Sequence, residues 1–178
     1  EHDIEDLIQR EDMVVTVTHG GYIKRVPLST YRAQRRGGKG RSGMATRDED
    51  FVSQVFVLNT HTPVLFFSTQ GLVYKLKAWK IPQGTANSKG KTLFNLLPLK
   101  NHQSISSIMP LPEKESEWKK LYVIFCTAKG KVRKNTLEDF SNIQSTGKIA
   151  MKLDPDDKIV GVKICRDDQD IILSTELG

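Results

Sequence analysis

The hydrophobic positions of this chain are grouped into short β-rich runs that are separated by polar, glycine-containing stretches. Three of the runs lead into a small hydroxyl residue, two further residues and a glycine, and a second β-rich run with a basic end follows each glycine. A hydrophobic strand, a glycine turn and a second strand predict a β-hairpin. The paired runs are MVVTV with YIKRV, PVLFF with LVYKLK, and LYVIF with KVRK.

These hairpins belong to a longer internal repeat. The turn glycines, including one in a fourth turn that reads TELG, are 50, 59 and 48 residues apart. In the first three copies a second glycine with a neighbouring lysine follows after 19, 19 and 17 residues, and a further β-rich run completes the copy. The turn glycines are Gly21, Gly71, Gly130 and Gly178, and the second glycines are Gly40, Gly90 and Gly147.

A repeat of about four short strands over roughly 50 residues predicts an all-β, propeller-like fold that is built from four-stranded blades. One blade cannot bury both of its faces, so neighbouring blades must stack. We expect an acidic lead-in at residues 1–12, helical or irregular, then blades at 13–60, 61–112 and 113–166 and the start of a fourth blade at 167–178. The last residues lie inside a hairpin, which predicts a fragment of a longer array.

The charge is distributed unevenly along the 178 residues. The net charge of the chain is +6, but residues 13–112 hold 14 lysines and arginines against three acids, a net charge of +11. The remainder holds 13 basic and 18 acidic residues, a net charge of −5. Such asymmetry indicates a polyanionic partner for the basic part of the chain. The alternative is a basic surface that has no such partner.

Motifs for nucleotide binding are present only in part. Residues 38–43, GKGRSG, have the glycine spacing of a dinucleotide fingerprint, but neither a helix pattern nor a suitably placed acid follows. Gly84 and Gly90 are separated by five residues where a phosphate-binding loop requires four. We therefore expect no cofactor site in this chain.

Catalytic and metal-binding patterns are not found either. The four histidines and the two cysteines lack metal-ligand spacing, and reduced cytosolic thiols are the favoured interpretation of the cysteines. The acid clusters at 48–50 and 154–157 could hold Mg²⁺ in principle, but a solvated Asp-rich turn is favoured. The longest apolar run, LYVIFC, is too short to cross a bilayer, so no membrane partner is expected.

The second-glycine loops are all basic and fall at one position of the repeat, so in an array of blades they would line one side. Together with basic hairpin ends they would form a curved track for duplex DNA, which binds by releasing counterions. Glycine permits close approach to phosphates, and arginine adds bidentate contacts. The candidate DNA-binding residues are Lys24, Arg25, Arg32, Arg41, Lys75, Lys77, Lys80, Lys89, Lys91, Lys131, Arg133, Lys134 and Lys148.

The first of these loops carries a specific motif. The sequence QRRGGKG at residues 34–40 resembles the gyrase A box, the heptapeptide of the C-terminal domain in the A subunit of bacterial DNA gyrase. The surrounding stretch EDMVVTVTHGGYIKRVPLSTYRAQRRGGKG and the later GLVYKLK, NLLPL and TGKIAMKL are also similar to that family. The resemblance implies DNA-binding roles for Gln34, Arg35, Arg36, Gly37, Gly38, Lys39 and Gly40.

The resemblance also implies a fold and an activity. The fold would be a six-bladed β-pinwheel whose neighbouring blades exchange strands, of which about three blades and the start of a fourth are present. The domain would wrap double-stranded DNA around its basic rim, so that the ATP-hydrolysing type II topoisomerase, an isomerase, introduces negative supercoils. Its partners would be the other domains of the gyrase A protein and the gyrase B protein, in an A2B2 heterotetramer in the bacterial cytoplasm at the nucleoid. Mg²⁺, ATP and the catalytic groups would belong to other parts of that holoenzyme.

Two alternatives stay open on the sequence. One is the equivalent domain of topoisomerase IV, whose box is degenerate or lost, so that the intact QRRGGKG argues against it. The other is a non-catalytic propeller scaffold for protein interactions, which leaves the strongly basic part of the chain unexplained.

Overall fold

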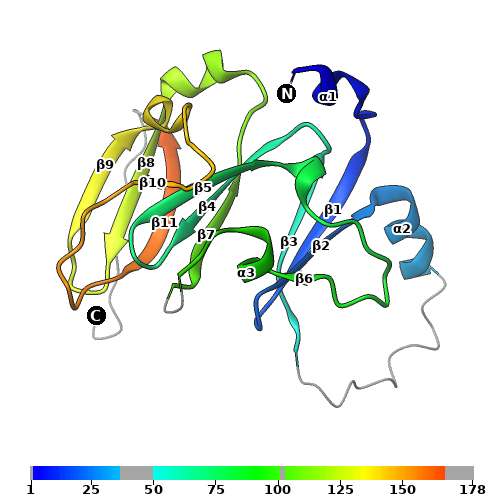
Figure 1. Cartoon of the computed structure of the whole chain (residues 1–178), viewed down its shortest axis with the longest axis horizontal. Coiled ribbons are helices and arrows are strands. Elements are labelled where there is room, and N and C mark those ends of the chain that lie inside the picture. Colours follow the sequence, from blue (N-terminus) through cyan, green and yellow to red (C-terminus); the bar gives the residue numbers. More distant parts are fainter. Residues whose placement is uncertain (1, 37–49, 101–102, 167–178) are drawn as a thin grey trace.

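A computed structural model describes residues 2–36, 50–100 and 103–166, and Figure 1 shows its three small sheets. The first repeat holds β1 (Asp12–Thr18), β2 (Tyr22–Pro27), α2 (Leu28–Arg36) and β3 (Val52–Asn59), after the lead-in helix α1 (His2–Leu7). The second holds β4 (Pro63–Ser68), β5 (Leu72–Lys77), η2 (Ala78–Lys80), β6 (Lys91–Thr92), α3 (Leu93–Leu96) and β7 (Ile105–Pro110). The third holds η3 (Glu115–Lys120), β8 (Leu121–Thr127), β9 (Val132–Thr136), η4 (Leu137–Phe140), β10 (Lys148–Ile149) and β11 (Ile159–Arg166).

The predicted hairpins are confirmed, and their turns share one arrangement. In the first turn the amide of Gly21 donates to the Thr18 carbonyl at 3.0 Å, and the amide of Tyr22 donates to the Thr18 hydroxyl at 3.1 Å. In the turns after β4 and β8 the equivalent amides donate the same two bonds to the carbonyl and hydroxyl oxygens of Ser68 and of Thr127. All three turn glycines have φ between 87° and 89°, which L residues adopt at a cost. The hydroxyl-x-x-Gly pattern is therefore a local hydrogen-bonding motif.

The sheets exchange strands between repeats. The strand orders are β3-β1-β2-β6, β10-β5-β4-β7 and β11-β8-β9, so β6 of the second repeat completes the first sheet and β10 of the third completes the second. All pairings between these strands are antiparallel, with Ile23 opposite Lys91 and Val73 opposite Lys148 in the exchanged pairs. The second and third repeats thus each cross onto the hairpin before them, and this exchange makes the blades a β-pinwheel.

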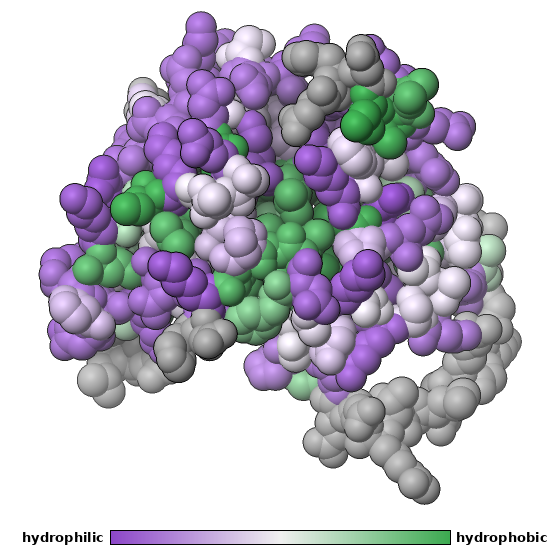
Figure 2. Space-filling view, viewed as in Figure 1, coloured by the Kyte–Doolittle hydropathy of each residue, from purple (hydrophilic) through white to green (hydrophobic). Residues whose placement is uncertain are grey.

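The middle sheet is buried on both faces, as stacking of blades requires. Every residue of β4 is buried, and the side chains alternate between two hydrophobic clusters. Phe66 packs with the first sheet, whereas Phe67 packs with the third and makes edge contacts with Phe125 and Phe140 at 5.4 and 6.0 Å between ring centroids. On the face shown in Figure 2, hydrophobic residues gather near the middle and hydrophilic residues cover most of the rest.

The helix α2 differs from the sequence-based expectation, which placed a loop at residues 34–40. Gln34, Arg35 and Arg36 belong to the last turn of this nine-residue helix, which contacts β1 and β2. Only Leu28, Tyr31 and Ala33 of the helix are apolar or aromatic, so its hydrophobic period is too short to be noticed. Basic residues at a helix C-terminus are favourable because they face the negative end of the helix dipole.

Candidate nucleic-acid interface

The crossing loops of the second and third repeats present lysines at equivalent places. Gly90 and Gly147 have φ of 86° and 91° and lead directly into the exchanged strands β6 and β10. A Cβ on Gly90 would lie 2.4 Å from the Ile23 carbonyl oxygen, so glycine is required where this loop passes over β2. Lys89 and Lys91 flank Gly90 and are exposed, and Lys148 follows Gly147 and is exposed as well. The structural equivalence of these two loops is therefore confirmed.

The remaining loop of the predicted set lies mainly outside the described residues. The predicted DNA-binding residues that lie outside the described residues are Gly37, Gly38, Lys39, Gly40 and Arg41. The side chains of Arg35 and Arg36 are not described either. Within the described part of α2, Arg32 is exposed and Gln34 is half-buried. The DNA-binding role of this heptapeptide stays a prediction.

Several of the exposed lysines lie over aromatic rings, which fixes their positions through cation–π attraction. The Lys89 ammonium lies 4.3 Å from the centroid of Tyr22, and the Lys134 ammonium lies 4.1 Å from that of Tyr122. The Lys80 ammonium is 5.3 Å from the neighbouring Trp79 ring. The side chains of these three lysines are exposed, so their ammonium groups remain accessible to an anion.

Other candidates bind protein groups. The Lys24 ammonium donates to three carbonyls of residues 85–88 at 2.7 to 3.1 Å, and the Lys75 ammonium donates to the Ser141 carbonyl at 2.6 Å. Arg25 likewise donates to carbonyls of the segment after β5. Burial lowers the pKa of Lys24, of Arg25 and of Lys75, because it disfavours the charged form. Their predicted phosphate contacts are untested, but these hydrogen bonds point to another role.

The ion pairs and side-chain bonds of three more candidates stay within the third repeat. Lys131 pairs with Asp154 at 2.7 Å, and Arg133 donates to the Asn135 side chain at 2.9 Å. Lys148 donates to the Asp139 carbonyl at 2.5 Å while its side chain stays exposed. All three side chains are on the surface, so these contacts hold their charges in place without removing them from solvent.

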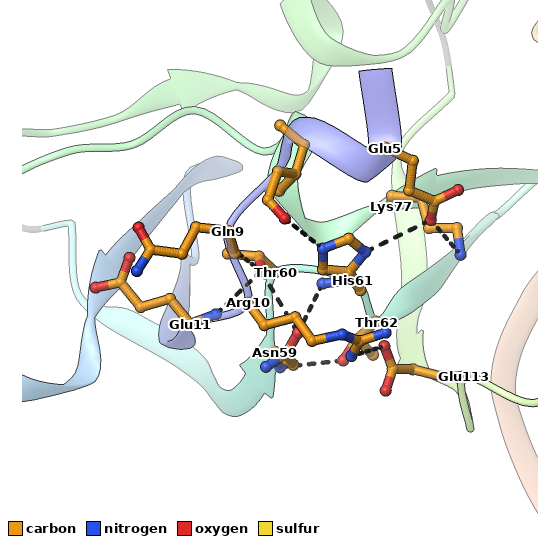
Figure 3. A network of polar contacts seen from close by, with 11 residues as sticks. Glu5, Gln9, Arg10, Glu11, Asn59, Thr60, His61, Thr62, Lys77 and Glu113 are labelled. Carbon is orange, nitrogen blue, oxygen red and sulfur yellow. Dashed lines mark hydrogen bonds and ion pairs between the residues drawn. The ribbon is translucent and has the colours of Figure 1, made fainter. Parts of the chain in front are cut away.

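The lead-in helix is attached to the second repeat by a polar network, shown in Figure 3. Glu5 pairs with Lys77 at 3.1 Å, and its carboxylate also lies 3.7 Å from Nδ1 of His61. The hydrogen bond from Lys77, more than any other contact, lowers the pKa of Glu5. His61 is buried, and its Nε2 lies 2.8 Å from the Ile8 carbonyl oxygen. Lys77, a predicted DNA contact, is therefore ion-paired with Glu5 of the lead-in segment.

The acid cluster at 154–157 contains a structural residue. Asp157 is buried and accepts hydrogen bonds from the amides of Lys129 and Lys158 at 3.1 and 2.9 Å. Burial alone raises the pKa of Asp157, but hydrogen bonds from the Thr127 hydroxyl and from these amides outweigh it, so the pKa is lowered. The favoured interpretation of a solvated turn is wrong for Asp157, which holds the turn between β8 and β9.

Asp50 does the same for the first hairpin, where its Oδ1 accepts from the Gly20 amide at 2.8 Å. Hydrogen bonds from the Thr18 hydroxyl and then from the Gly20 amide lower the pKa of Asp50. Both acids stand two residues before the last strand of their repeat, and this shared place is the sequence signal that identifies them. Among the described residues no group of three or more potential metal ligands is found, and no helix there has the length and apolar character of a membrane span.

An all-β array of strand-exchanged blades with basic crossing loops defines a β-pinwheel, and comparisons identify its family. The family model described as DNA gyrase C-terminal domain, beta-propeller, matches residues 12–59, 62–112 and 121–166. These segments make up more than half of the chain, which therefore belongs to the DNA gyrase C-terminal domain family.

Curated relatives and solved structures agree. The A subunit of DNA gyrase from Rickettsia bellii (strain RML369-C) is 60% identical over the whole chain, which covers 20% of that protein. The A subunit of DNA gyrase from Clostridium acetobutylicum is 42% identical over 99% of the chain and is covered to 21%. The chain thus spans about one fifth of the length of the curated relatives that it matches.

The solved structures share the fold. A gyrase A C-terminal domain matches 89% of this chain and 49% of its own length, with a TM-score of 0.59 and 25% identity. A topoisomerase IV C-terminal domain matches 88% of this chain and 46% of its own, with a TM-score of 0.73 and 24% identity. Because both domains have the same fold, the family model and the curated relatives, not the fold, distinguish gyrase from topoisomerase IV.

Proposed function

We propose that this chain binds duplex DNA along its basic crossing loops and bends it around the rim of the array. The observation that carries the proposal is the equivalent placement of Lys91 and Lys148, which are exposed and begin the exchanged strands of two successive sheets, with the exposed Lys89 two residues before Lys91. A regular series of exposed cations suits the regular phosphate backbone, and it predicts backbone contacts rather than sequence readout. The net charge of +11 on residues 13–112 supports the same partner.

In the complete gyrase, we infer, this bending becomes wrapping, and ATP-driven strand passage by the holoenzyme then introduces negative supercoils. The partners would be the remainder of the gyrase A protein and the gyrase B protein in an A2B2 heterotetramer. The support is that the relatives matching the whole chain are gyrase A proteins. Mg²⁺ and ATP would act elsewhere in that assembly, and its place would be the bacterial cytoplasm at the nucleoid.

The box is tested by the triple variant Arg35→Ala/Arg36→Ala/Lys39→Ala. We expect this variant to lose most of its ability to wrap a relaxed DNA circle, which is measured as a change in the topology of the DNA. Its circular dichroism should stay β-rich. A matched control removes the same charge from Lys114, Lys119 and Lys120, which are exposed and lie at or beside η3. Equal wrapping by the box variant and the native chain would refute the role of the box.

Salt dependence provides a second measurement of the proposal. If about six phosphates are neutralised, the logarithm of the binding constant should fall against the logarithm of salt with a slope near −5. A protein-interaction scaffold would bind DNA weakly and without such a slope.

A further inference from the structure

Two basic residues in the middle of β2, Lys24 and Arg25, connect the first repeat to the second. Arg25 donates through Nε to the Ile81 carbonyl at 2.6 Å and through its terminal nitrogens to the Trp79 carbonyl at 3.3 Å and the Gln83 side chain at 3.4 Å. Lys24 holds the following residues 85–88 through three carbonyls. A backbone hydrogen bond also connects the two repeats, from the Gly84 amide to the Arg25 carbonyl at 3.0 Å.

The second and third repeats are joined in the same way. Lys75 lies four residues after its turn glycine, as Arg25 does, and donates to the Ser141 carbonyl at 2.6 Å. Ser141 directly follows η4, and Ile81 directly follows η2, so both cations reach the C-terminal end of the 3₁₀ turn in the next repeat. Carbonyls at such an end have no partner within the turn and attract cations.

These contacts differ from those of a phosphate ligand. Arg25 and Lys75 are half-buried and their donors face backbone oxygens of another repeat, whereas Lys89, Lys91 and Lys134 are exposed. A partly desolvated cation with fixed acceptors stabilises one arrangement of its neighbours, because any other arrangement leaves buried polar groups unpaired. The residues therefore favour one angle between successive sheets.

We propose that Lys24, Arg25 and Lys75 are positioning residues that fix the angle between successive repeats and thereby set the curvature of the DNA track. This inference rests on the proposed function for its consequence on DNA, but the contact itself is a property of the protein alone. Bent DNA is stable only if contacts to successive repeats are made together, since each additional contact offsets the cost of bending. If the angle between successive repeats were not fixed, each repeat could still contact DNA by itself, but the DNA would not be bent.

The variant Arg25→Met tests this, because methionine keeps an unbranched apolar stem and removes the guanidinium. Two DNA probes are used with the 178-residue chain: a duplex of about 10 bp, too short to be bent across repeats, and an end-labelled duplex of about 30 bp whose bending is read by energy transfer. We expect the affinity for the short duplex to change less than about twofold and the bending signal to fall by at least about half.

Lys134→Met is the matched comparison, since Lys134 has the equivalent place in the third repeat and is exposed. We expect this variant to weaken binding to both duplexes alike and to lower the salt slope by about 0.9. Amide exchange gives a readout that needs no DNA: residues 81–88 should exchange roughly tenfold faster in Arg25→Met but not in Lys134→Met.

Each outcome decides the inference. Unchanged exchange in Arg25→Met, together with equal losses on the short and long duplexes, would make Arg25 a phosphate ligand and overturn the proposal. Should Arg25→Met fail to fold, Arg25→Lys, which keeps a donor at this place, should restore slow exchange at 81–88 and intermediate bending. If the native chain bends no DNA, the proposed function fails. The exchange data alone then decide whether Arg25 holds residues 81–88 in place.

Discussion

The strand exchange makes a quantitative prediction at Gly90. In the variant Gly90→Ala, φ of 86° costs an L residue about 1–2 kcal/mol. In addition, the new Cβ would lie 2.4 Å from the oxygen and 2.9 Å from the carbon of the Ile23 carbonyl, so the backbone of β6 must move away from β2. If two hydrogen bonds are lost at about 0.5–1.5 kcal/mol each, the exchange contributes a further 1–3 kcal/mol or so.

Gly130→Ala is the control for the conformational cost. Gly130 has φ of 88°, but a Cβ there meets no atom within 4 Å, so this variant should lose only about 1–2 kcal/mol. Urea unfolding followed by circular dichroism gives both free energies, and amide exchange at Leu93, whose N–H donates to the Gly21 carbonyl at 2.9 Å, reports on β6 directly. Equal destabilisation within about 0.5 kcal/mol, with Leu93 unaffected, would refute the role assigned to the exchanged strand.

Three further predictions concern the core, the turns and the surface. Phe67→Leu should destabilise the chain by about 1–3 kcal/mol more than Phe66→Leu in urea unfolding, because of these two residues only Phe67 makes edge contacts with other rings among the described residues; equal losses would contradict the assignment. Asp157 has a lowered pKa in the folded chain, so its stabilising effect is complete above its unfolded pKa of about 3.9 and is lost as pH falls through the folded pKa. Asp157→Asn should therefore flatten the acid limb of a pH–stability curve, and an unchanged limb would count against it. Lys89→Ala/Lys91→Ala should make the salt slope of DNA binding shallower by about 1.8, whereas alanine at the two exposed lysines that end η3 should leave it unaltered.

The repeat, the hairpins and their turns could be predicted from the sequence because each depends on residues close together in the chain. The hydrogen bond from the Tyr22 amide to the Thr18 hydroxyl spans only four residues. The burial of β4 on both faces is visible in the sequence as a continuous apolar run. The family-specific heptapeptide was equally visible, but the helical conformation of its first three residues was not, since α2 is stabilised by its contacts with β1 and β2.

The division of the basic residues into two groups could not be predicted. Lys24 and Lys89 have the same chemistry, but Lys24 is 61 to 64 residues away from the carbonyls that it binds, whereas Lys89 lies over Tyr22. Such distant contacts depend on how the sheets stack, which the sequence pattern does not specify. The same is true of Asp157, whose turn partner Lys129 is 28 residues away.

The backward crossing of β6 and β10 has a consequence for how such arrays can change in length. Because the second and third repeats each complete the sheet before them with a short Lys-containing strand after a glycine of positive φ, β10 could occupy on β2 the place that β6 occupies now. Removal of one whole repeat, or insertion of another, would leave every internal sheet complete. Duplication or deletion of the DNA that encodes one repeat would thus add or remove one blade, and each such step would change the basic rim by one crossing loop.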